Sequence, residues 1–345
     1  MAYTTINKST DYFNTKLYAG TGSSLALTGV GHQPDLVWIK ERSGATNHFL
    51  HDAVRGATKS LFPNLNVAED TNAQYLTAFG TDGFTVGTNG GINTNGNNYL
   101  SWNWKAGGGQ GSSNTDGSIN TTYTSVNTTA GFSISKYTGN NTANATVGHG
   151  LGVAPEVVII KRLDSSGSWI SKFNSNTDGY MYLHADDAMS SSSGWLPTSS
   201  TTFTLANQWT AYNASGGTYI AYCFAPKTGF SKFGEYIGNG NSDGNFLYCG
   251  FAPAWVVCKS IDTTSHWNCF DNKRSTFNPV NDYHKLNEAT AEDTNVSDIQ
   301  FDFLSNGLKI RGNNDEYNGS GEKYIYMAFA EAPLVGSNNI PCTAR

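Results

Sequence analysis

Adjacent acidic residues are side chains whose type and spacing in this sequence could serve acid–base catalysis. Adjacent carboxylates occur three times, as Asp186 with Asp187, Glu292 with Asp293, and Asp315 with Glu316. Glycoside hydrolysis needs two carboxyl groups that face each other across a sugar, roughly 5–10 Å apart. Neighbouring acids on a turn-like stretch are normally solvated instead, so we predict no catalytic residue among them.

One acidic turn recurs in the chain. The sequence Glu-Asp-Thr-Asn stands at residues 69–72 and again at residues 292–295. Short polar side chains commonly close turns by bonding to nearby backbone, which favours loop capping at both places. Clustered oxygen atoms also suit calcium, and that alternative stays open beside our prediction of no metal site.

Histidines invite a metal or catalytic-triad interpretation, and the chain has seven: His32, His48, His51, His149, His184, His266 and His284. His32 and His149 both come shortly before a strand proline, which predicts a structural hydrogen bond at a turn. The densest cluster, at residues 48–52, is predicted to pack as a loop beneath a sheet. No nucleophile motif such as G-x-S-x-G accompanies these residues, so we expect neither an enzyme nor a cofactor.

A surplus of aromatic side chains stands in surroundings rich in Ser, Thr, Asn and Gly. Aromatic rings stack on the apolar faces of sugars, while amides and hydroxyls satisfy sugar hydroxyl groups. Such residues can equally fill sandwich cores or contacts between subunits. The glycan-binding candidates are Tyr180, Tyr182, Trp195, Trp209 and Tyr212.

The elements that must position these residues come from an internal repeat. Residues 34–40, 155–161 and 253–259 each read as a proline, a largely apolar strand and a lysine. An aromatic strand running into a glycine turn precedes each copy, and a Tyr-rich strand closes it. The strands are apolar on both alternating faces, which indicates cover on both sides. One face would fill a sandwich core, and the other would lie under a loop, a helix or a neighbouring module.

The repeat and the composition together predict an all-β fold of three tandem antiparallel β-sandwich modules, of jelly-roll or lectin-like kind. Charged residues make up only 14% of the chain, and 38 glycines supply turns. We place short helical turns near residues 53–60 and 281–291, and hairpin tips at residues 87–91. The predicted divisions are an N-terminal arm at 1–12, module 1 at 13–106, a Gly/Ser/Thr/Asn-rich linker or packed strap at 107–130, module 2 at 131–226, module 3 at 229–333 and a tail at 334–345.

Charge and cysteine content limit the partners. The net charge is −6 and no basic stripe is present, so nucleic acid is not an expected partner. No apolar run is long enough to span a membrane, and the first residues lack the apolar core of a signal peptide. The five cysteines form no framework or metal pattern, and Cys258, in a position held elsewhere by isoleucine, is expected to be a small buried hydrophobe.

At its repeats and ends the chain resembles a known family. The segments at residues 3–13, 34–40, 99–106 and 336–345 are similar to repeated β-rich structural proteins of tailed, often marine, bacteriophages. Members are commonly labelled tail-fibre, adhesin or virion structural proteins, and they carry no known catalytic residue that could be transferred.

The resemblance implies a virion component assembled in the host cytoplasm. We expect a non-enzymatic tail-fibre or adhesin-type protein that contacts host glycans. We also expect it to associate with other virion proteins and with copies of itself, as a trimer. The alternatives are a capsid decoration or tail scaffold without receptor binding, and a polysaccharide depolymerase.

Overall fold

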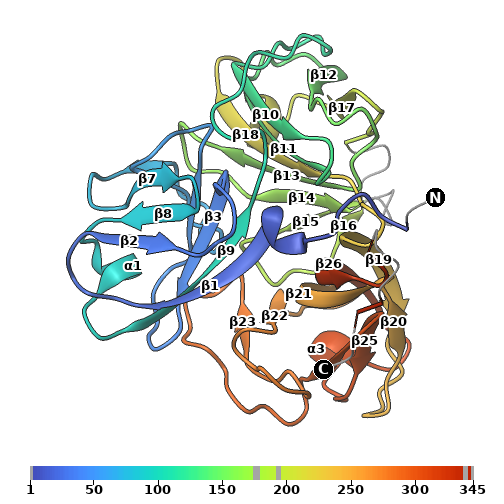
Figure 1. Cartoon of the computed structure of the whole chain (residues 1–345). Helices are drawn as coiled ribbons and strands as arrows, with labels where there is room; N and C mark the ends of the chain where they lie inside the picture. Colours follow the sequence, from blue (N-terminus) through green and yellow to red (C-terminus); the bar gives the residue numbers. More distant parts are fainter. Residues whose placement is uncertain (1–2, 174–178, 192–195, 337–340, 343–345) are drawn as a thin grey trace.

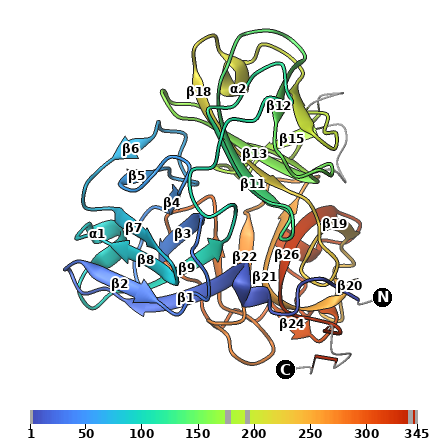
Figure 2. The same cartoon turned by 45° about the horizontal axis from the view of Figure 1, so that its top comes forward.

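The computed structural model describes residues 3–173, 179–191, 196–336 and 341–342, and the prediction of an all-β fold is confirmed. Three lobes, coloured blue to cyan, green to yellow and orange to red, surround a common centre (Figure 1). Turning the molecule keeps all three lobes in contact around that centre (Figure 2). We call them the first, second and third units. Their division at the predicted module boundaries stays a prediction.

The first unit contains two stacked antiparallel sheets. The larger has the order β1 (Phe13–Ala19), β9 (Asn98–Trp104), β3 (Leu36–Glu41), β4 (Phe49–Asp52). The smaller has the order β2 (Leu25–Thr28), β8 (Gly83–Val86), β7 (Leu76–Gly80). The short elements are η1 (Ser9–Asp11), β5 (Lys59–Ser60), β6 (Asp70–Thr71) and α1 (Gly90–Asn93).

The second unit repeats this strand order and extends it at both ends. Its large sheet is β10 (Tyr123–Asn127), β11 (Phe132–Thr138), β18 (Thr218–Phe224), β13 (Val157–Arg162), β14 (Ile170–Phe173), β15 (Gly179–Tyr182), β16 (Ser190–Ser191). Its small sheet pairs β12 (Ala145–Gly148) with β17 (Thr202–Leu205), and α2 is Thr210–Asn213.

The third unit repeats the order again. Its large sheet is β19 (Ser231–Ile237), β26 (Lys323–Pro333), β21 (Phe251–Ser260), β22 (Asn268–Asp271), β23 (Tyr283–Lys285). Its small sheet is β20 (Phe246–Tyr248), β25 (Gly307–Ile310), β24 (Phe301–Leu304), and α3 is Asp315–Asn318. The registers show which residues are equivalent between the units. Ser231 is equivalent to Phe13, and His48 is equivalent to Trp169 and Trp267.

The strands that are apolar on both faces serve two cores, as expected. In β3, Val37 and Ile39 face the first unit's own sandwich, while Leu36 and Trp38 join a central core that all three units share. Val157 of β13 joins the same central core. A wholly apolar cavity of about 40 Å³ remains at this centre, lined by side chains from all three units.

The lysine that ends each repeat strand is buried. The Nζ atoms of Lys40, Lys161 and Lys259 each donate to the carbonyl oxygen of the following residue, at 2.9, 2.9 and 2.6 Å. Burial lowers the pKa of each lysine to about 8. The repeated lysine is thus a buried backbone anchor at the end of the strand.

A motif that the sequence interpretation missed, Asn-x-x-Gly-x-x-Tyr, closes each unit at residues 93–99, 213–219 and 318–324. The Asn is wholly buried, and its Oδ1 accepts a backbone N–H from the turn after β1, β11 or β19. The central Gly has positive φ in all three copies, 81°, 72° and 81°, which favours glycine. The Tyr hydroxyl accepts a backbone N–H and donates to the carbonyl at the start of the short helix.

The short helices therefore lie outside the predicted places. Residues 87–91 lead into α1 and are not a hairpin tip, because Asn89 caps that helix. Residues 53–60 and 281–291 form turns and short strands and contain no helix. In each unit a buried Asn joins the short helix to the neighbouring loop by hydrogen bonds. These bonds explain why a helix forms even at the Gly-rich residues of α1.

Residues 107–130 form a packed strap. β10 pairs along β11, and Ile119 bridges to Val147 at the small sheet. The strap begins where the carboxylate of buried Asp35 accepts the backbone N–H groups of Ala106, Gly108 and Gly109, at 2.7, 2.9 and 2.7 Å. The composition of this segment allowed either a flexible linker or a packed strap, and its described pairings are those of a strap.

Candidate functional site

Four of the five predicted glycan candidates meet on the second unit. Tyr180 and Tyr182 lie on β15, Trp209 directly precedes α2, and Tyr212 lies on α2. The ring of Tyr180 is 5.4 Å from that of Tyr182 and 5.2 Å from that of Trp209, which is 5.6 Å from Tyr212. Trp195 lies outside the described residues. We call Tyr180, Tyr182, Trp209 and Tyr212 the aromatic cluster.

Burial separates the roles within the aromatic cluster. Tyr180, Tyr182 and Trp209 are partly exposed, whereas Tyr212 is wholly buried. Tyr212 therefore cannot touch a ligand; it is the floor on which the Trp209 ring packs edge-on. The three outer rings can offer flat faces and hydroxyl groups to solvent.

Trp209 occupies a position where the other units have a helix-capping residue. Asn89 and Asn314 precede α1 and α3, and each accepts a backbone N–H with its side chain. Trp209 makes no such bond before α2. Losing an Asn cap costs about 1 kcal/mol, so the second unit carries an indole here at the expense of local helix stability. The packing of this indole against Tyr180 is what the substitution adds.

Tyr182 of this cluster stays protonated at neutral pH. Burial, the hydrogen bond with Tyr180 and the nearby charge of Asp187 raise the pKa of Tyr182 well above its ordinary value. The hydroxyls of Tyr180 and Tyr182 are 3.5 Å apart. The site therefore presents hydroxyl groups beside apolar ring faces, which suits a sugar.

The three units close into a ring through one repeated backbone contact. The residue two positions after each strand lysine accepts, with its carbonyl oxygen, a backbone N–H from the next unit. The carbonyl of Arg42 accepts from Glu292 at 3.0 Å, that of Leu163 from Glu69 at 2.9 Å, and that of Ile261 from Met189 at 3.0 Å. From the acceptor to the donor, each contact runs in the same direction around the ring: from the first unit to the third, from the third to the second, and from the second to the first. We call these three boundaries the seams.

A side-chain ring nitrogen also forms a bond across each seam, in the same direction around the ring of units. His48 Nε2 lies 3.2 Å from the Lys285 carbonyl, Trp169 Nε1 donates to the Phe62 carbonyl at 3.0 Å, and Trp267 Nε1 donates to the Tyr182 carbonyl at 3.1 Å. Trp38 Nε1, a donor only, bonds to His48 Nδ1 at 2.9 Å. His48 must therefore carry its proton on Nε2 and donate it to Lys285.

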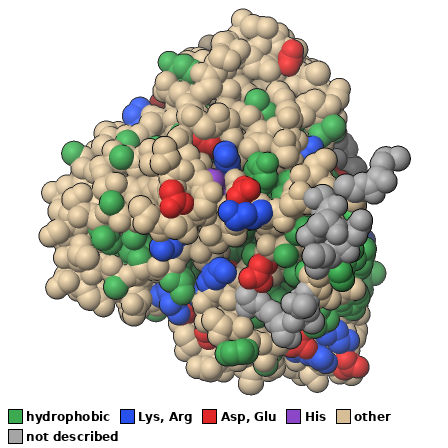
Figure 3. Space-filling model, viewed as in Figure 1, with side chains coloured by type: hydrophobic (Ala, Val, Ile, Leu, Met, Phe, Trp, Pro, Cys, Tyr) green, Lys and Arg blue, Asp and Glu red, His purple; other side chains and the backbone are tan. Residues whose placement is uncertain are grey.

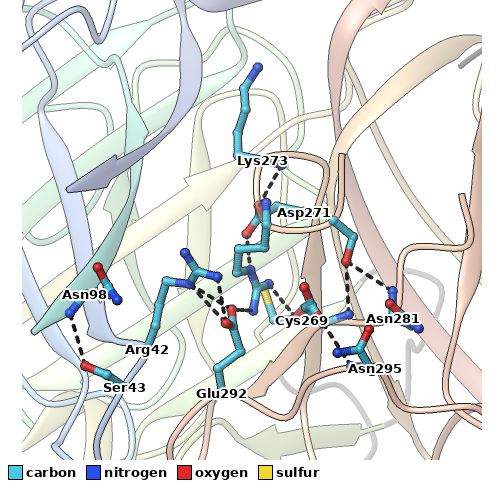
Figure 4. A network of polar contacts seen from close by, with 12 residues as sticks. Arg42, Ser43, Asn98, Cys269, Asp271, Lys273, Asn281, Glu292 and Asn295 are labelled. Carbon is cyan, nitrogen blue, oxygen red and sulfur yellow. Dashed lines mark hydrogen bonds and ion pairs between the residues drawn. The ribbon is translucent and has the colours of Figure 1, made fainter. Parts of the chain in front are cut away.

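Two seams also hold buried ion networks, whereas the described residues that stand at the equivalent positions of the third seam are apolar. Between the first and third units, Trp102 donates to Asp271. Asp271 pairs with Arg274, and Arg274 and Arg42 both pair with Glu292 (Figure 4).

The seam between the second and first units has the same arrangement. Tyr222 donates to Asp52, which pairs with Arg55, and Arg55 pairs with Glu69. At the third seam, the equivalents of Asp52 and Tyr222 are Phe173 and Met327, and both line the central cavity.

These contacts indicate the role of the recurring acidic turn. Glu69 and Glu292 are bound by buried arginines, and the Glu292 side chain is only 4% exposed. The Glu292 carboxylate crosses its seam to Arg42, and the Glu69 backbone N–H crosses its seam to Leu163, which agrees with a structural role for the turn. In the described parts of the chain, no group of three or more His, Cys, Asp or Glu residues is placed to hold a metal ion.

The histidines near the strand prolines make the predicted structural bonds. His32 Nδ1 lies 2.8 Å from the Thr10 carbonyl, and His149 Nε2 lies 3.2 Å from the Ser199 carbonyl. Burial lowers the pKa of His32 to about 4 and lowers that of His149 as well. Both rings are neutral at physiological pH, and their hydrogen bonds are structural.

Glu316 and the cysteines have structural surroundings. Glu316, at the start of α3, accepts from Asn268, and His266 lies between Glu316 and Glu288, at 4.0 and 3.7 Å. The backbone carbonyl of Asp186 accepts the N–H of Ser265 at a seam. All five cysteines are free, and Cys258 is buried as expected.

Comparison with known proteins gives one match. A family model described as a domain of unknown function (DUF7483) matches residues 8–333. No curated protein and no solved structure matches the chain. Within the described ranges, none of the helices has the length and apolar character that crossing a membrane would require.

Proposed function

The chain belongs to the DUF7483 family, whose description assigns no function, and we propose that it is a non-enzymatic attachment protein that contacts glycans through Tyr180, Tyr182 and Trp209. The observation that carries this proposal is the exchange of a helix-capping Asn for a partly exposed Trp in one unit of three. The three units can be compared directly, because the same short helix forms with Asn at this position in the other two units.

The chemistry of the aromatic cluster favours a sugar ligand. Partly exposed rings beside hydroxyl and amide groups match the alternation of apolar faces and hydroxyls on a pyranose. Asn207 and Gln208, both exposed, precede Trp209 and add amide groups to its surroundings. We expect weak binding per copy, with avidity supplied by many copies.

The resemblance of the sequence to structural proteins of tailed phages supports a place on a virion. In that setting the protein displays its second unit toward the host surface. A capsid decoration or tail scaffold is the second candidate, and a patch of exposed apolar residues on the third unit favours it. Immuno-gold labelling of intact particles separates a fibre tip from a capsid lattice or an internal tail position.

A glycan array tests the proposal. The purified protein, biotinylated and multimerised on streptavidin, is expected to label a restricted set of neutral glycans. A protein with Trp209→Asn, which installs the capping residue of the other two units, is expected to lose that labelling. Absence of labelling by the multimerised wild-type protein, or equal labelling by the variant, would remove the basis for the proposal.

A further inference from the structure

The seam between the first and third units contains two buried histidines, His48 and His284, whose rings lie 6.3 Å apart. Most histidines of the chain are buried, and histidine contributes little surface to the face that Figure 3 shows. The equivalents of His48 and His284 in the other two units carry no titratable group: they are Trp169 and Trp267, and Leu61 and Met181. Mild acid can therefore charge these two positions at one seam alone.

The two hydrogen bonds of His48 hold it in its neutral form. Its Nδ1 accepts from Trp38 Nε1 at 2.9 Å, and its Nε2 donates across the seam to the Lys285 carbonyl, 3.2 Å away. A proton on Nδ1 would set one donor against another and break the bond with Trp38. Burial, with the nearby charges of Lys40 and Arg274, lowers the pKa of His48 well below its ordinary value of 6.5.

The place of His284 suits a charge even less. Among the described residues, neither of its ring nitrogens has a hydrogen-bond partner, and the ring is almost wholly enclosed. The charged side chains that face it are Arg274, Lys40 and Arg42, all of them cations, and His48 is its titratable neighbour. Burial and these cations lower the pKa of His284 well below 6.5. The chain thus keeps an unpaired polar ring here at the expense of stability.

The carboxylates of this seam already bind arginines. Asp271 pairs with Arg274, and Glu292 pairs with both Arg274 and Arg42. The Lys40 ammonium is bonded to backbone carbonyls. A proton on either histidine would therefore add a further positive charge beside three buried or partly buried cations, which is costly while the seam excludes water.

Chain connectivity leaves this seam freer to part than the others. The strap joins the first unit to the second, and residues 227–229 join the second to the third. At the remaining seam the N-terminal arm supplies the link, through hydrogen bonds from Tyr3 and Thr4 to the carbonyls of Gly250 and Thr228. These bonds involve neither histidine, so the arm can act as a hinge while the seam opens at His48.

We propose that the seam between the first and third units opens reversibly in mild acid, on protonation of His48 and His284, while the seam between the second and first units stays closed. In the open seam both rings are solvated and take up protons at their ordinary affinity, whereas the closed seam keeps both neutral. The state that binds more protons gains population as the pH falls. Opening uncovers Trp102, which packs edge-on against His284 and belongs to the shared central core.

Hydrogen exchange at single backbone amides tests this proposal, because it reports local opening. The N–H of Glu292 donates to Arg42 across the first–third seam, and the N–H of Glu69 donates to Leu163 across the second–first seam. Exchange is followed by NMR from about pH 7.5 to about pH 5, above the range in which carboxylates ordinarily titrate, and corrected for the intrinsic rate. Each solvated histidine raises the opening constant by about thirtyfold over this window. The protection of Glu292 should therefore fall by roughly a thousandfold, and that of Glu69 by less than about threefold.

Three variants assign the effect to its residues. His284→Met installs the residue of the second unit and breaks no described hydrogen bond, so the fall at Glu292 should shrink to about thirtyfold. Adding His48→Gln removes the other titratable ring and should abolish the fall. His51→Gln is the matched control, because His51 is buried but bonds to the Lys59 carbonyl within the first unit; the full fall should remain. Melting temperatures at neutral pH monitor the fold of each variant, and His284→Met alone suffices if the double variant does not fold.

The other outcomes contradict the proposal. Equal falls at Glu292 and Glu69 in the wild-type protein would show a general loss of stability in acid. Constant protection of Glu292 over the whole window would show that the seam stays closed. A full fall that persists in His284→Met, or any large fall in the double variant, would show that these histidines do not control the opening.

Discussion

The phenol hydroxyl of Tyr222 donates a hydrogen bond to the carboxylate of Asp52, 2.7 Å away, across the seam between the second and first units. Both side chains are buried, and Asp52 is also bound by Arg55. Tyr222→Phe removes one bond from a buried charge without changing the ring. We expect the free energy of unfolding to fall by about 1.5–3 kcal/mol, measured by urea denaturation.

The third unit supplies the control for this substitution. Met327 is equivalent to Tyr222 and lines the apolar seam next to Phe173. Met327→Leu conserves volume and removes no hydrogen bond, so the loss should stay below about 1.5 kcal/mol. Equal losses for the two variants would show that the seam contact of Tyr222 contributes nothing beyond packing.

Trp169 makes the second seam contact that can be removed cleanly. Its Nε1 donates to the carbonyl oxygens of Phe62 and Leu65, both at 3.0 Å. Trp104 is also buried, but its Nε1 has no hydrogen-bond partner. Trp169→Phe is therefore expected to cost about 1–3 kcal/mol more than Trp104→Phe. Thermal and urea unfolding of the two variants provide the comparison, and equal costs would contradict the assigned role.

The Asn of the closing motif should matter equally in all three units. Asn213 is wholly buried and connects the backbone N–H of Asn140 to the carbonyl of Thr142. Asn213→Ala leaves both groups without this partner, so we expect a loss of about 3 kcal/mol in the free energy of unfolding. Asn93→Ala and Asn318→Ala should give similar losses. A harmless substitution in any one unit would show that its short helix does not depend on the motif.

Stability should fall in mild acid because buried histidines resist protonation. Burial lowers the pKa of His51 to about 4, against an ordinary value of 6.5. The unfolded chain therefore takes up this proton first as the pH falls, and stability rises with pH between about 4 and 6.5. The single group contributes about 3 kcal/mol over this window. His51→Gln should flatten the dependence by about one proton, and an unchanged slope would contradict the assignment.

The sequence predicted the architecture better than its details. Strands apolar on both faces indicated cover on both sides, and Val37 and Leu36 do face different cores. The seams could not be predicted, because the partner of each strand end lies far away in the chain, as Glu292 does from Arg42, Glu69 from Leu163 and Met189 from Ile261. The Asn-x-x-Gly-x-x-Tyr spacing was visible in all three units, yet the glycine-rich composition of residues 87–91 suggested a hairpin tip just before the first copy. The buried Asn side chain, not local propensity, sets the helical turn.

The candidate site was predictable in composition but not in geometry. Tyr180, Tyr182 and Trp209 were chosen as aromatics in polar surroundings, and the pairing of β15 with β14 brings them together beside α2. Tyr212 belonged to the same list but lies buried beneath Trp209. Burial depends on how α2 packs on the sheet, which composition does not reveal. Aligning the three units would have shown that Trp209 replaces a capping Asn.

Titration of a glycan identified on the array tests the central claim most directly, with wild-type protein and Trp209→Asn compared by isothermal calorimetry. The restored cap offsets lost ring packing, so we expect the variant's free energy of unfolding to stay within about 1 kcal/mol of the wild type. We predict at least a roughly tenfold loss of affinity, about 1.4 kcal/mol, with the fold intact. Unchanged affinity in a folded variant would contradict the assignment of Trp209 and its neighbours as the glycan site.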